Sequence, residues 1–562
     1  MATSYAVPPA AQQGPKAIAS SQLGVCSTDN NIVTGVVLDV LKHGGNAADA
    51  GVAAALVQAA IEPSMTNCSG TVAALYWEQA TRSVHQLDSM GRLVPHLPPF
   101  RPLPPDIGSY CPPGVPAPMA AIPGFMPGLA ELHRRFGSRP WAQLCEYAIE
   151  LAEEGHVVTS FEYGVHIWCQ RFITYSEAGQ ALYCPNGFLV PVGERFRNPA
   201  LAETLRRTAK EGPEWFTTGG WARDFVATAN SMGWGITLAD LLSNPPRWEE
   251  PLRYEHRGRE LVQLALPERQ ALYCSLVLGV LKSLRYEQME PLSADALWAM
   301  SHAMRWAERD CGYLHDPTIF HTPVDVLLDR GYHESVARIL QHSRPKVDLR
   351  EHLRVRRGIA SDSSQGTVEM KQPAGSCELS IVDRDGNWLQ MMNTLQSGGI
   401  PGAVVGGVPM VGSHAALGSM GSSIHGLSIT GWLHERARIR SVMGCTLVLE
   451  EGVPVLGLGT PGKPDVAVVQ VLSHVLDHGL DVARAIDMPR MLPLGDNFEL
   501  TIENRIPARS RQGLERLGIE VAAIAPYEIH LGSFQVCQRD PVKGALRAFA
   551  DPRRCGVAGG LA

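Results

Sequence analysis

Ser376 and Cys377 stand side by side after Gly375, at the start of the segment GSCELSIVDRDGNWLQMMNTLQ. A hydroxyl or a thiol can form a covalent acyl intermediate when a base and a supporting hydrogen-bonding group lie nearby. Thr394, near the end of the same segment, supplies a second hydroxyl. These residue types suit acyl transfer, but two half-buried hydroxyls that merely satisfy each other would have the same pattern.

A β-hairpin would bring the two hydroxyls together. ELSIVD and WLQMMNT flank RDGN, and Asp-Gly is a favoured two-residue hairpin turn. With Asp-Gly at 385–386 as the turn, Ser376 lies opposite Leu395, one residue from Thr394. The sequence therefore predicts a hairpin that places a nucleophile near a supporting hydroxyl.

The surrounding pattern divides the chain into two parts. HGGNAADAGVAAALVQAAIEP predicts an alanine-rich helix from about Asn46 to Ile61, packed closely on a sheet and ended by Pro63. TVAALYWEQATRSVHQLDS predicts two short strands, and the proline-rich residues 94–123 predict a long loop. The pattern is then mainly helical to about residue 350 and changes to strands and turns after residue 375.

The charge and the composition exclude several classes of partner. The chain has 562 residues and a net charge of -7, so no basic surface for nucleic acid or for an anionic membrane is expected. We find neither a signal peptide nor a membrane span in the sequence. A small molecule is the expected partner.

The twelve cysteines are dispersed and form no C-x-x-C pair. This spacing argues against a structural zinc site and favours a reducing compartment, so we expect a cytoplasmic protein. No His, Asp and Glu cluster has the spacing of metal ligands, and no metal or cofactor is implied.

Six segments, in order along nearly the whole chain, resemble the γ-glutamyltransferase (γ-glutamyl transpeptidase) family of N-terminal nucleophile (Ntn) hydrolases. They are GGNAADAGVAAAL, IPGFMPGLAELHRRFGSRPWAQLCEYAIELAEEGHVVT, SCELSIVDRDGNWLQMMNTLQ, SVMGCTLVLEEGVPVLGLGTPG, DVARAIDMPR and GSFQV with GALRAFADPRRCGVAGG. The third resembles the family's TTHYSVVDxDGN…TLN without a gap. The resemblance implies an α+β fold, a four-layer αββα sandwich built jointly by a large N-terminal and a small C-terminal segment.

The resemblance also implies self-cleavage of the precursor. The ungapped match places Ser376 on the family's nucleophilic Thr, with the cut between Gly375 and Ser376. Residues 1–375 would form the large segment and residues 376–562 the small one, an αβ heterodimer whose further oligomeric state stays open. Glycine would allow a strained backbone before the cut, and Cys377 would be the nucleophile if the register were off by one.

Further catalytic roles carry over position by position. Thr394 matches the family Thr whose hydroxyl supports the nucleophile. Gly462 and Lys463, in GTPGK, match the glycine pair whose backbone N–H groups form the oxyanion hole. A lysine in the second place can still supply its backbone N–H.

The positions that bind the γ-glutamyl group in the family are altered. Met90 or Gly91 occupies the arginine place in LDSMGRLVP, and Arg92 is shifted. ALPERQALY and TNCSGTVAA stand in place of two further family segments. The candidate substrate-binding residues are Arg92, Gln396, Ser413, His414, Ser441 and Val442. Lost contacts to an amino-acid zwitterion predict a less charged acyl group.

The leading interpretation is therefore a self-processing Ntn hydrolase that attacks a non-glutamyl carbonyl through Ser376 and forms an acyl-enzyme. An amide or a C–C bond could be cleaved, as in relatives recruited to antibiotic (alkylproline) biosynthesis. Two alternatives stay open: an uncut, non-catalytic relative that acts as a scaffold, and a conventional γ-glutamyl hydrolase or transferase for which Arg92 is the one supporting feature.

Overall fold

Two antiparallel seven-stranded sheets lie face to face at the centre of the computed structural model, which describes residues 5–93, 121–231, 235–314, 316–350, 375–395, 402–410, 437–438, 441–493, 499–540 and 542–562. The first, here called the hairpin sheet, has the order β23 (Val557–Gly560), β2 (Val25–Thr28), β12 (Cys377–Val382), β13 (Trp388–Thr394), β3 (Thr71–Glu78), β4 (Ser83–Ser89) and β9 (Arg247–Glu249). The second sheet has the order β1 (Ala19–Ser21), β22 (Leu546–Ala550), β21 (Gln535–Arg539), β17 (Val453–Gly459), β16 (Thr446–Glu450), β11 (Arg259–Gln263) and β10 (Leu252–His256).

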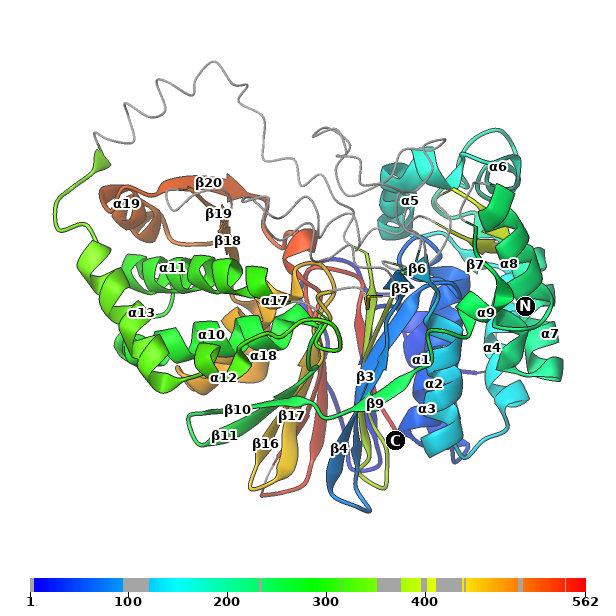
Figure 1. The fold of residues 1–562 in the computed structure, drawn as a ribbon, viewed down its shortest axis with the longest axis horizontal. Coiled ribbons are helices and arrows are strands. Elements are labelled where there is room, and N and C mark those ends of the chain that lie inside the picture. Colours follow the sequence, from blue (N-terminus) through cyan, green and yellow to red (C-terminus); the bar gives the residue numbers. More distant parts are fainter. Residues whose placement is uncertain are drawn as a thin grey trace.

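Helices cover both outer faces, which gives the four layers of an αββα sandwich (Figure 1). The hairpin-sheet side carries α1 (Asn31–Lys42), α2 (Ala47–Ile61), α3 (Phe125–Phe136), α4 (Trp141–Glu154), α5 (Ser160–Ile173), α6 (Glu177–Tyr183), α7 (Pro199–Glu211), α8 (Gly220–Ser231) and α9 (Leu238–Leu241). The second-sheet side carries α10 (Arg269–Ser283), α11 (Ala294–Asp310), α12 (Val324–Leu327), α13 (Arg330–Ser343), α17 (Pro464–Leu476), α18 (Val482–Asp487) and α19 (Ala508–Arg516). The predicted fold class is confirmed.

Short elements complete the described chain. They are the strands β5 (Arg92–Leu93), β6 (Ala121–Ile122), β7 (His156–Val157), β8 (Arg195–Phe196), β14 (Val404–Val405), β15 (Val408–Pro409), β18 (Met491–Pro493), β19 (Glu499–Glu503) and β20 (Glu520–Ile524), and four short 3-10 helices. Residues 94–120 of the predicted proline-rich loop lie outside the described residues, but its end is a strand, because β6 pairs with β5.

Both sheets contain strands from before and from after position 376. In the hairpin sheet, β12 lies between β2 and β13, and β13 pairs in turn with β3. In the second sheet, β16 lies between β11 and β17. Each sheet therefore needs both parts of the chain, as the resemblance implied, and a cut before Ser376 would leave two interleaved segments held by backbone ladders.

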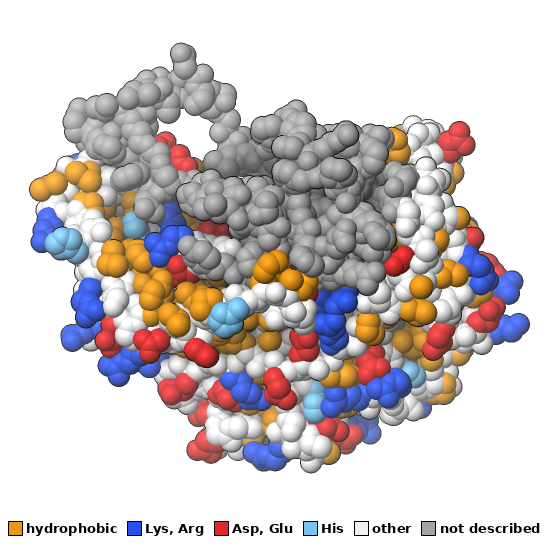
Figure 2. All heavy atoms as spheres, viewed as in Figure 1, with side chains coloured by type: hydrophobic (Ala, Val, Ile, Leu, Met, Phe, Trp, Pro, Cys, Tyr) orange, Lys and Arg blue, Asp and Glu red, His pale blue; other side chains and the backbone are white. Residues whose placement is uncertain are grey.

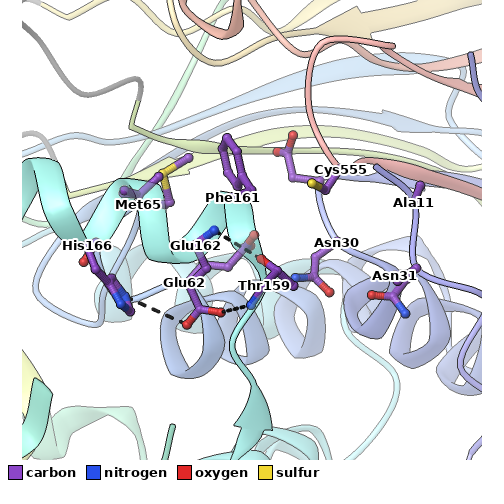
Figure 3. Close-up of a pocket in the computed structure, with 14 residues that line it drawn as sticks. Ala11, Asn30, Asn31, Glu62, Met65, Thr159, Phe161, Glu162, His166 and Cys555 are labelled. Carbon is purple, nitrogen blue, oxygen red and sulfur yellow. Dashed lines mark hydrogen bonds and ion pairs between the residues drawn. The ribbon is translucent and has the colours of Figure 1, made fainter. Parts of the chain in front are cut away.

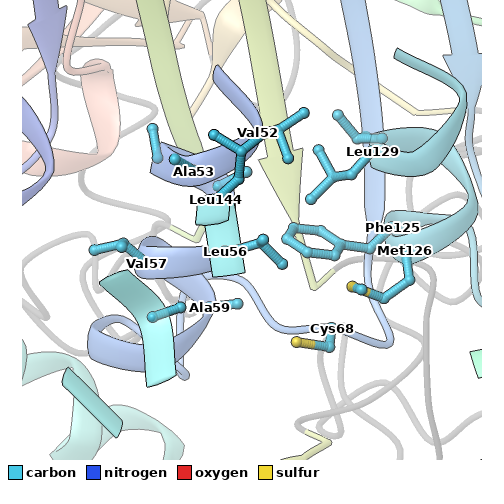
Figure 4. Packing of buried hydrophobic residues seen from close by; sticks show 14 of the residues in the cluster. Val52, Ala53, Leu56, Val57, Ala59, Cys68, Phe125, Met126, Leu129 and Leu144 are labelled. Atoms are coloured by element: carbon cyan, nitrogen blue, oxygen red, sulfur yellow. The ribbon is translucent and has the colours of Figure 1, made fainter. Parts of the chain in front are cut away.

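The alanine-rich helix α2 packs against the hairpin sheet as predicted, with all of its residues buried (Figure 4). Asn46 caps it, since its side chain accepts from the Asp49 N–H. A Cβ added at Gly51 would lie 2.1 Å from Leu389 Cδ2, so the absence of a side chain permits the close approach. This packing fixes the C-terminal end of α2, where Glu62 and Met65 lie, beside the start of β12.

The predicted two-residue hairpin turn is wrong by one position. Val382 pairs with Trp388 and Asp383 N–H donates to Asn387 O at 3.1 Å, so the loop has three residues and Gly386, at φ +87°, takes the left-handed conformation. The pairing of Cys377 with Asn393 then brings Ser376 level with Thr394 instead of Leu395.

Candidate active site

Ser376 lies at the start of β12, where its hydroxyl meets that of Thr394. Ser376 Oγ donates to Thr394 Oγ1 at 2.8 Å, and both residues are buried. The Ser376 N–H donates to Met65 O at 3.1 Å. The predicted nucleophile and its predicted supporting hydroxyl are thus brought together, with both the hydroxyl and the amide of Ser376 held in place.

The backbone at the predicted cut is strained. Ser376 has φ +81°, in the left-handed region that non-glycine residues rarely adopt. Such a conformation typically costs about 1–3 kcal/mol and persists only where its surroundings enforce it. The sequence analysis expected this strain at Gly375. The structure instead has it one residue later, in the φ angle of Ser376 itself.

Cys377 is poorly suited to be the nucleophile. Its side chain is fully buried, and Sγ donates to Glu62 Oε2 at 3.4 Å. Burial, followed by the nearby Glu62 carboxyl, raises the pKa of the Cys377 thiol well above its usual value. Because the thiolate is the reactive form, this environment suppresses the alternative in which Cys377 attacks.

The predicted oxyanion turn follows β17 directly. Thr460 Oγ1 accepts from the Ser533 N–H at 2.6 Å, and Gly462 has φ +91°. A Cβ at Gly462 would lie 2.8 Å from His530 O, so a side chain is excluded there. Lys463 is the N-cap of α17, and unpaired N–H groups and the positive end of the helix dipole gather at such a terminus. The turn therefore has the local features of an anion-stabilising site.

Only some of the predicted substrate-binding residues lie within the described part of the chain. Gln396, Ser413 and His414 lie outside the described residues. Ser441 is buried and its carbonyl accepts from the Arg269 N–H at 3.0 Å, while Val442 is half-buried.

Arg92 and Met90 lie in the segment that matches the family's arginine segment. Arg92 is half-buried, its Nη1 donates to Ser243 O at 3.2 Å, and burial lowers its pKa. Met90 is 1 % exposed and belongs to the apolar cluster between the two sheets. One of the two residues that the resemblance offered for the family's arginine place is thus part of the core.

Arg438 is a buried cation that the sequence did not reveal. Its Nη1 lies 2.5 Å from Asp88 Oδ2 and 2.7 Å from Glu249 Oε1. Its backbone N–H donates to Asp316 Oδ2 at 2.8 Å. Burial lowers the pKa of Arg438, but these carboxylates outweigh it and raise the pKa overall. The three acidic partners neutralise the charge of Arg438. Arg438 and its partners come from four segments that are too distant in sequence for any motif to join them.

A cavity with about 500 Å³ of empty space, part of it open to solvent, adjoins the nucleophile strand on its helical side and is lined by both polar and apolar side chains (Figure 3). Met65, Asp29, Glu62, Glu162 and His166 are among its lining residues. Burial raises the pKa of Glu62 to about 8 and that of Asp29 to about 6, and burial lowers the pKa of His166 to about 4. At neutral pH, Glu62 is therefore largely protonated and His166 is neutral.

Neither metal-binding nor membrane-spanning features were found where the structure is described. Within those ranges, no three His, Cys, Asp or Glu side chains are arranged to hold a metal ion. The same residues contain no helix that is long and apolar enough to cross a membrane. The face shown in Figure 2 carries acidic and basic side chains intermixed.

Comparisons with known proteins agree with this architecture. The family model for γ-glutamyltranspeptidase matches residues 34–561, and the chain belongs to that family of Ntn hydrolases. The glutathione hydrolase proenzyme of Pseudomonas aeruginosa is 27 % identical over 93 % of this chain and 92 % of its own. The acylase ACY 1 proenzyme of Pseudomonas sp. strain SE83 is 24 % identical over 97 % of this chain and 95 % of its own.

The fold has a full-length counterpart among solved structures. Cephalosporin acylase from Bacillus halodurans superposes with a TM-score of 0.80 at 23 % identity, over 100 % of this chain and 99 % of that one. The family assignment predicted from the motifs is confirmed, and the chain is an enzyme of the Ntn-hydrolase and acyltransferase type.

Proposed function

We propose that this chain is a precursor that cuts itself between Gly375 and Ser376 and then uses Ser376 as an N-terminal nucleophile. The observation that carries the proposal is the 2.8 Å contact between the Ser376 and Thr394 hydroxyls, at a backbone with φ +81°. The names of two similar proteins, both called proenzymes, agree with processing. The cut separates residues 1–375 from residues 376–562, which stay together as a heterodimer.

Self-cleavage requires attack of Ser376 Oγ on the carbonyl carbon of Gly375. The C–O bond forms, the C–N bond breaks, and the hydroxyl proton passes to the departing nitrogen, which leaves an ester. Water then hydrolyses this ester to a Gly375 carboxylate and restores the Ser376 hydroxyl, next to the α-amine that the shift has already freed. Relief of the left-handed φ at Ser376 favours the step, because a chain terminus no longer has this constraint.

The same groups then turn over an external substrate. The α-amine, whose unperturbed pKa is about 8, takes the Ser376 hydroxyl proton as Oγ attacks the substrate carbonyl. The proton passes to the leaving group as its bond to the acyl carbon breaks, and the acyl group passes from Ser376 to water or to an amine. Backbone N–H groups of Gly462 and Lys463 stabilise the oxyanion, and Thr394 holds the nucleophile.

The acyl group is proposed to be non-glutamyl. Met90, one of the two residues offered for the family's arginine place, is buried in the core, and Arg438 is neutralised by its three acidic partners. A small biosynthetic molecule with an amide, or with a C–C bond next to a carbonyl, is the substrate class we infer. The cytoplasm is the inferred location, supported by the eleven described cysteines, none of which forms a disulfide.

Intact mass and N-terminal sequencing of the purified protein test the proposal. We expect two chains, the smaller one beginning SCELSIVD, and one uncut chain for Ser376→Ala. Cys377→Ala is the matched control and should be cut like the wild type. An uncut wild-type chain would favour the scaffold alternative, and a small chain beginning CELSIVD would move the chemistry to Cys377.

A further inference from the structure

Glu378 is a buried acid on the nucleophile strand, two residues after Ser376. Its side chain lies between the two sheets, where it contacts Gly459 of β17 in the second sheet. It is fully buried, and Oε1 accepts from Gln390 Nε2 at 2.5 Å and lies 3.6 Å from Cys445 Sγ. The family motif quoted above has histidine at this place, so this acid is a feature of the present chain.

The Glu378 carboxyl packs against the strand that leads to the oxyanion turn. A Cβ added at Gly459 would lie 2.0 Å from Glu378 Oε1 and 2.8 Å from its Oε2. Gly459 is the last residue of β17, and the turn of residues 460–463 follows it at once. The carboxyl therefore occupies the place of a side chain at Gly459, in contact with the backbone from which the turn starts.

A second set of contacts connects β12 to the oxyanion turn through Asp29. The Glu378 N–H donates to Asp29 Oδ2 at 2.7 Å, and Ser533 Oγ donates to Asp29 Oδ1 at 3.1 Å. The Ser533 N–H in turn donates to Thr460 Oγ1 at 2.6 Å, within the turn. Glu378 is thus connected to the oxyanion turn in two ways. Its side chain contacts Gly459, and its backbone N–H is linked to Thr460 through Asp29 and Ser533.

We propose that Glu378 is a positioning residue whose buried carboxyl sets the place of the Gly462 turn relative to Ser376. The inference rests on the proposed function. Stability alone does not account for the residue, because burying a carboxyl is unfavourable and an apolar side chain of similar volume would fill the same space. Burial raises the pKa of Glu378 well above its usual value, which favours the uncharged form of the carboxyl.

Three variants test this role. Glu378→Gln keeps the shape and an uncharged hydrogen-bonding amide, whereas Glu378→Leu keeps only the approximate volume. Leu379→Met changes the neighbouring buried residue, on the opposite face of β12, and controls for general disturbance of the core. The readouts are the first-order rate of self-cleavage, the melting temperature, and kcat and KM for release of p-nitrophenolate from p-nitrophenyl acetate.

We expect Glu378→Gln to cleave itself and to release p-nitrophenolate within about threefold of the wild type, with an unchanged pH profile. Glu378→Leu should slow self-cleavage by about 10²-fold, and lower kcat similarly with KM within threefold, since displacement of a catalytic group by about 1 Å can have such an effect. Its melting temperature should not fall below that of Leu379→Met, which should behave as the wild type.

Several results would overturn the inference. A Glu378→Leu variant with unchanged rates, or one changed only in KM, would show that the carboxyl positions nothing that reacts. A Glu378→Gln variant as slow as Glu378→Leu would show an ionised role instead. Failure of the proposed function is distinguishable, because it appears in the wild type itself as an uncut chain whose Ser376 is not acetylated.

Discussion

Ser376 and Thr394 face each other across the open end of the β12–β13 hairpin, with 2.8 Å between their hydroxyl oxygens. Thr394 is fully buried, and its strand pairs with β3, where Thr71 lies opposite it. The supporting hydroxyl is therefore fixed by two strand ladders, while the nucleophile sits at the strand end. This relationship makes the contribution of Thr394 measurable without altering the nucleophile.

Thr394→Ala should slow self-cleavage by about 10- to 100-fold, because it removes the group that accepts from Ser376 Oγ. A hydrogen-bonding group of this kind contributes about 1–3 kcal/mol. Thr394→Ser keeps the hydroxyl and should stay within about threefold of the wild type. The rate is followed as conversion of one chain into two on a denaturing gel, and equal rates for the Ala and Ser variants would contradict the assigned role.

Cys377 should be dispensable for the chemistry. We expect Cys377→Ala to cleave itself within about threefold of the wild type, since the thiol is buried and its pKa is raised. A thiol reagent applied to the native protein should leave Cys377 unmodified, as judged by peptide mass mapping, and should modify it after denaturation. Rapid native labelling at this position would contradict the burial on which the choice of Ser376 partly depends.

The Glu62 carboxyl should make stability fall as the pH rises. Burial raises its pKa in the folded chain from 4.5 to about 8, so the folded state binds more protons than the unfolded state between these values. This contribution is fully present below about pH 4.5 and is lost as the pH rises toward about 8. In the Ser376→Ala background, Glu62→Gln should thus gain stability over its parent across this window, by roughly 3–5 kcal/mol at most.

Denaturant unfolding of the two uncut proteins at a series of pH values measures this difference. Glutamine can still accept from Cys377 Sγ, which in the parent donates to Glu62 Oε2 at 3.4 Å, so the comparison isolates the ionisation. A pH-independent difference between the two proteins would mean that Glu62 is not held in its protonated form.

Arg438→Met should destabilise the fold strongly, by about 3–5 kcal/mol at neutral pH, because it leaves three acidic partners without their buried cation. The loss should diminish at acidic pH, because burial, followed by the nearby Asp88 carboxylate, raises the pKa of Glu249, and removal of the Arg438 guanidinium should raise it further. Thermal unfolding at pH 7 and pH 5 checks the expectation, with exposed Arg330→Met as a matched control that should change little. An equal loss at both pH values would contradict the electrostatic cause.

Patterns that are local in sequence predicted most of the fold. The alanine-rich helix, the strands β3 and β4, and the β12–β13 hairpin each follow from periodicity and turn residues, and they form as expected. The register failed by one position because Asp-Gly fits both a two-residue turn and the end of a three-residue loop with Gly386 left-handed. That choice depends on how the whole ladder packs, which a turn motif cannot show.

Features built from distant segments could not be predicted. The ion pairs of Arg438 with its three acidic partners join β4, β9 and two loops. The close contact between Glu378 and Gly459 joins strands of opposite sheets. Neither leaves a periodic or spaced signal. Burial of Cys377 was also invisible, because strand alternation gives the face of a side chain but not what covers it.

Substrate preference is the sharpest test of the proposed non-glutamyl specificity. A γ-glutamyl group needs a cation for its carboxylate, but Met90 is buried among apolar residues and Arg438 is already paired with three acids. Each missing charged contact weakens binding by about 1–3 kcal/mol, so two of them predict roughly 30- to 10⁴-fold. We therefore expect kcat/KM for hexanoyl-p-nitroanilide to exceed that for γ-glutamyl-p-nitroanilide by at least about 30-fold, with Ser376→Ala as the blank. Preference for the γ-glutamyl compound would instead favour the conventional γ-glutamyl hydrolase or transferase. Arg92 would then be assigned to the substrate carboxylate, because it is the half-buried cation nearest the family's arginine place in the described sequence.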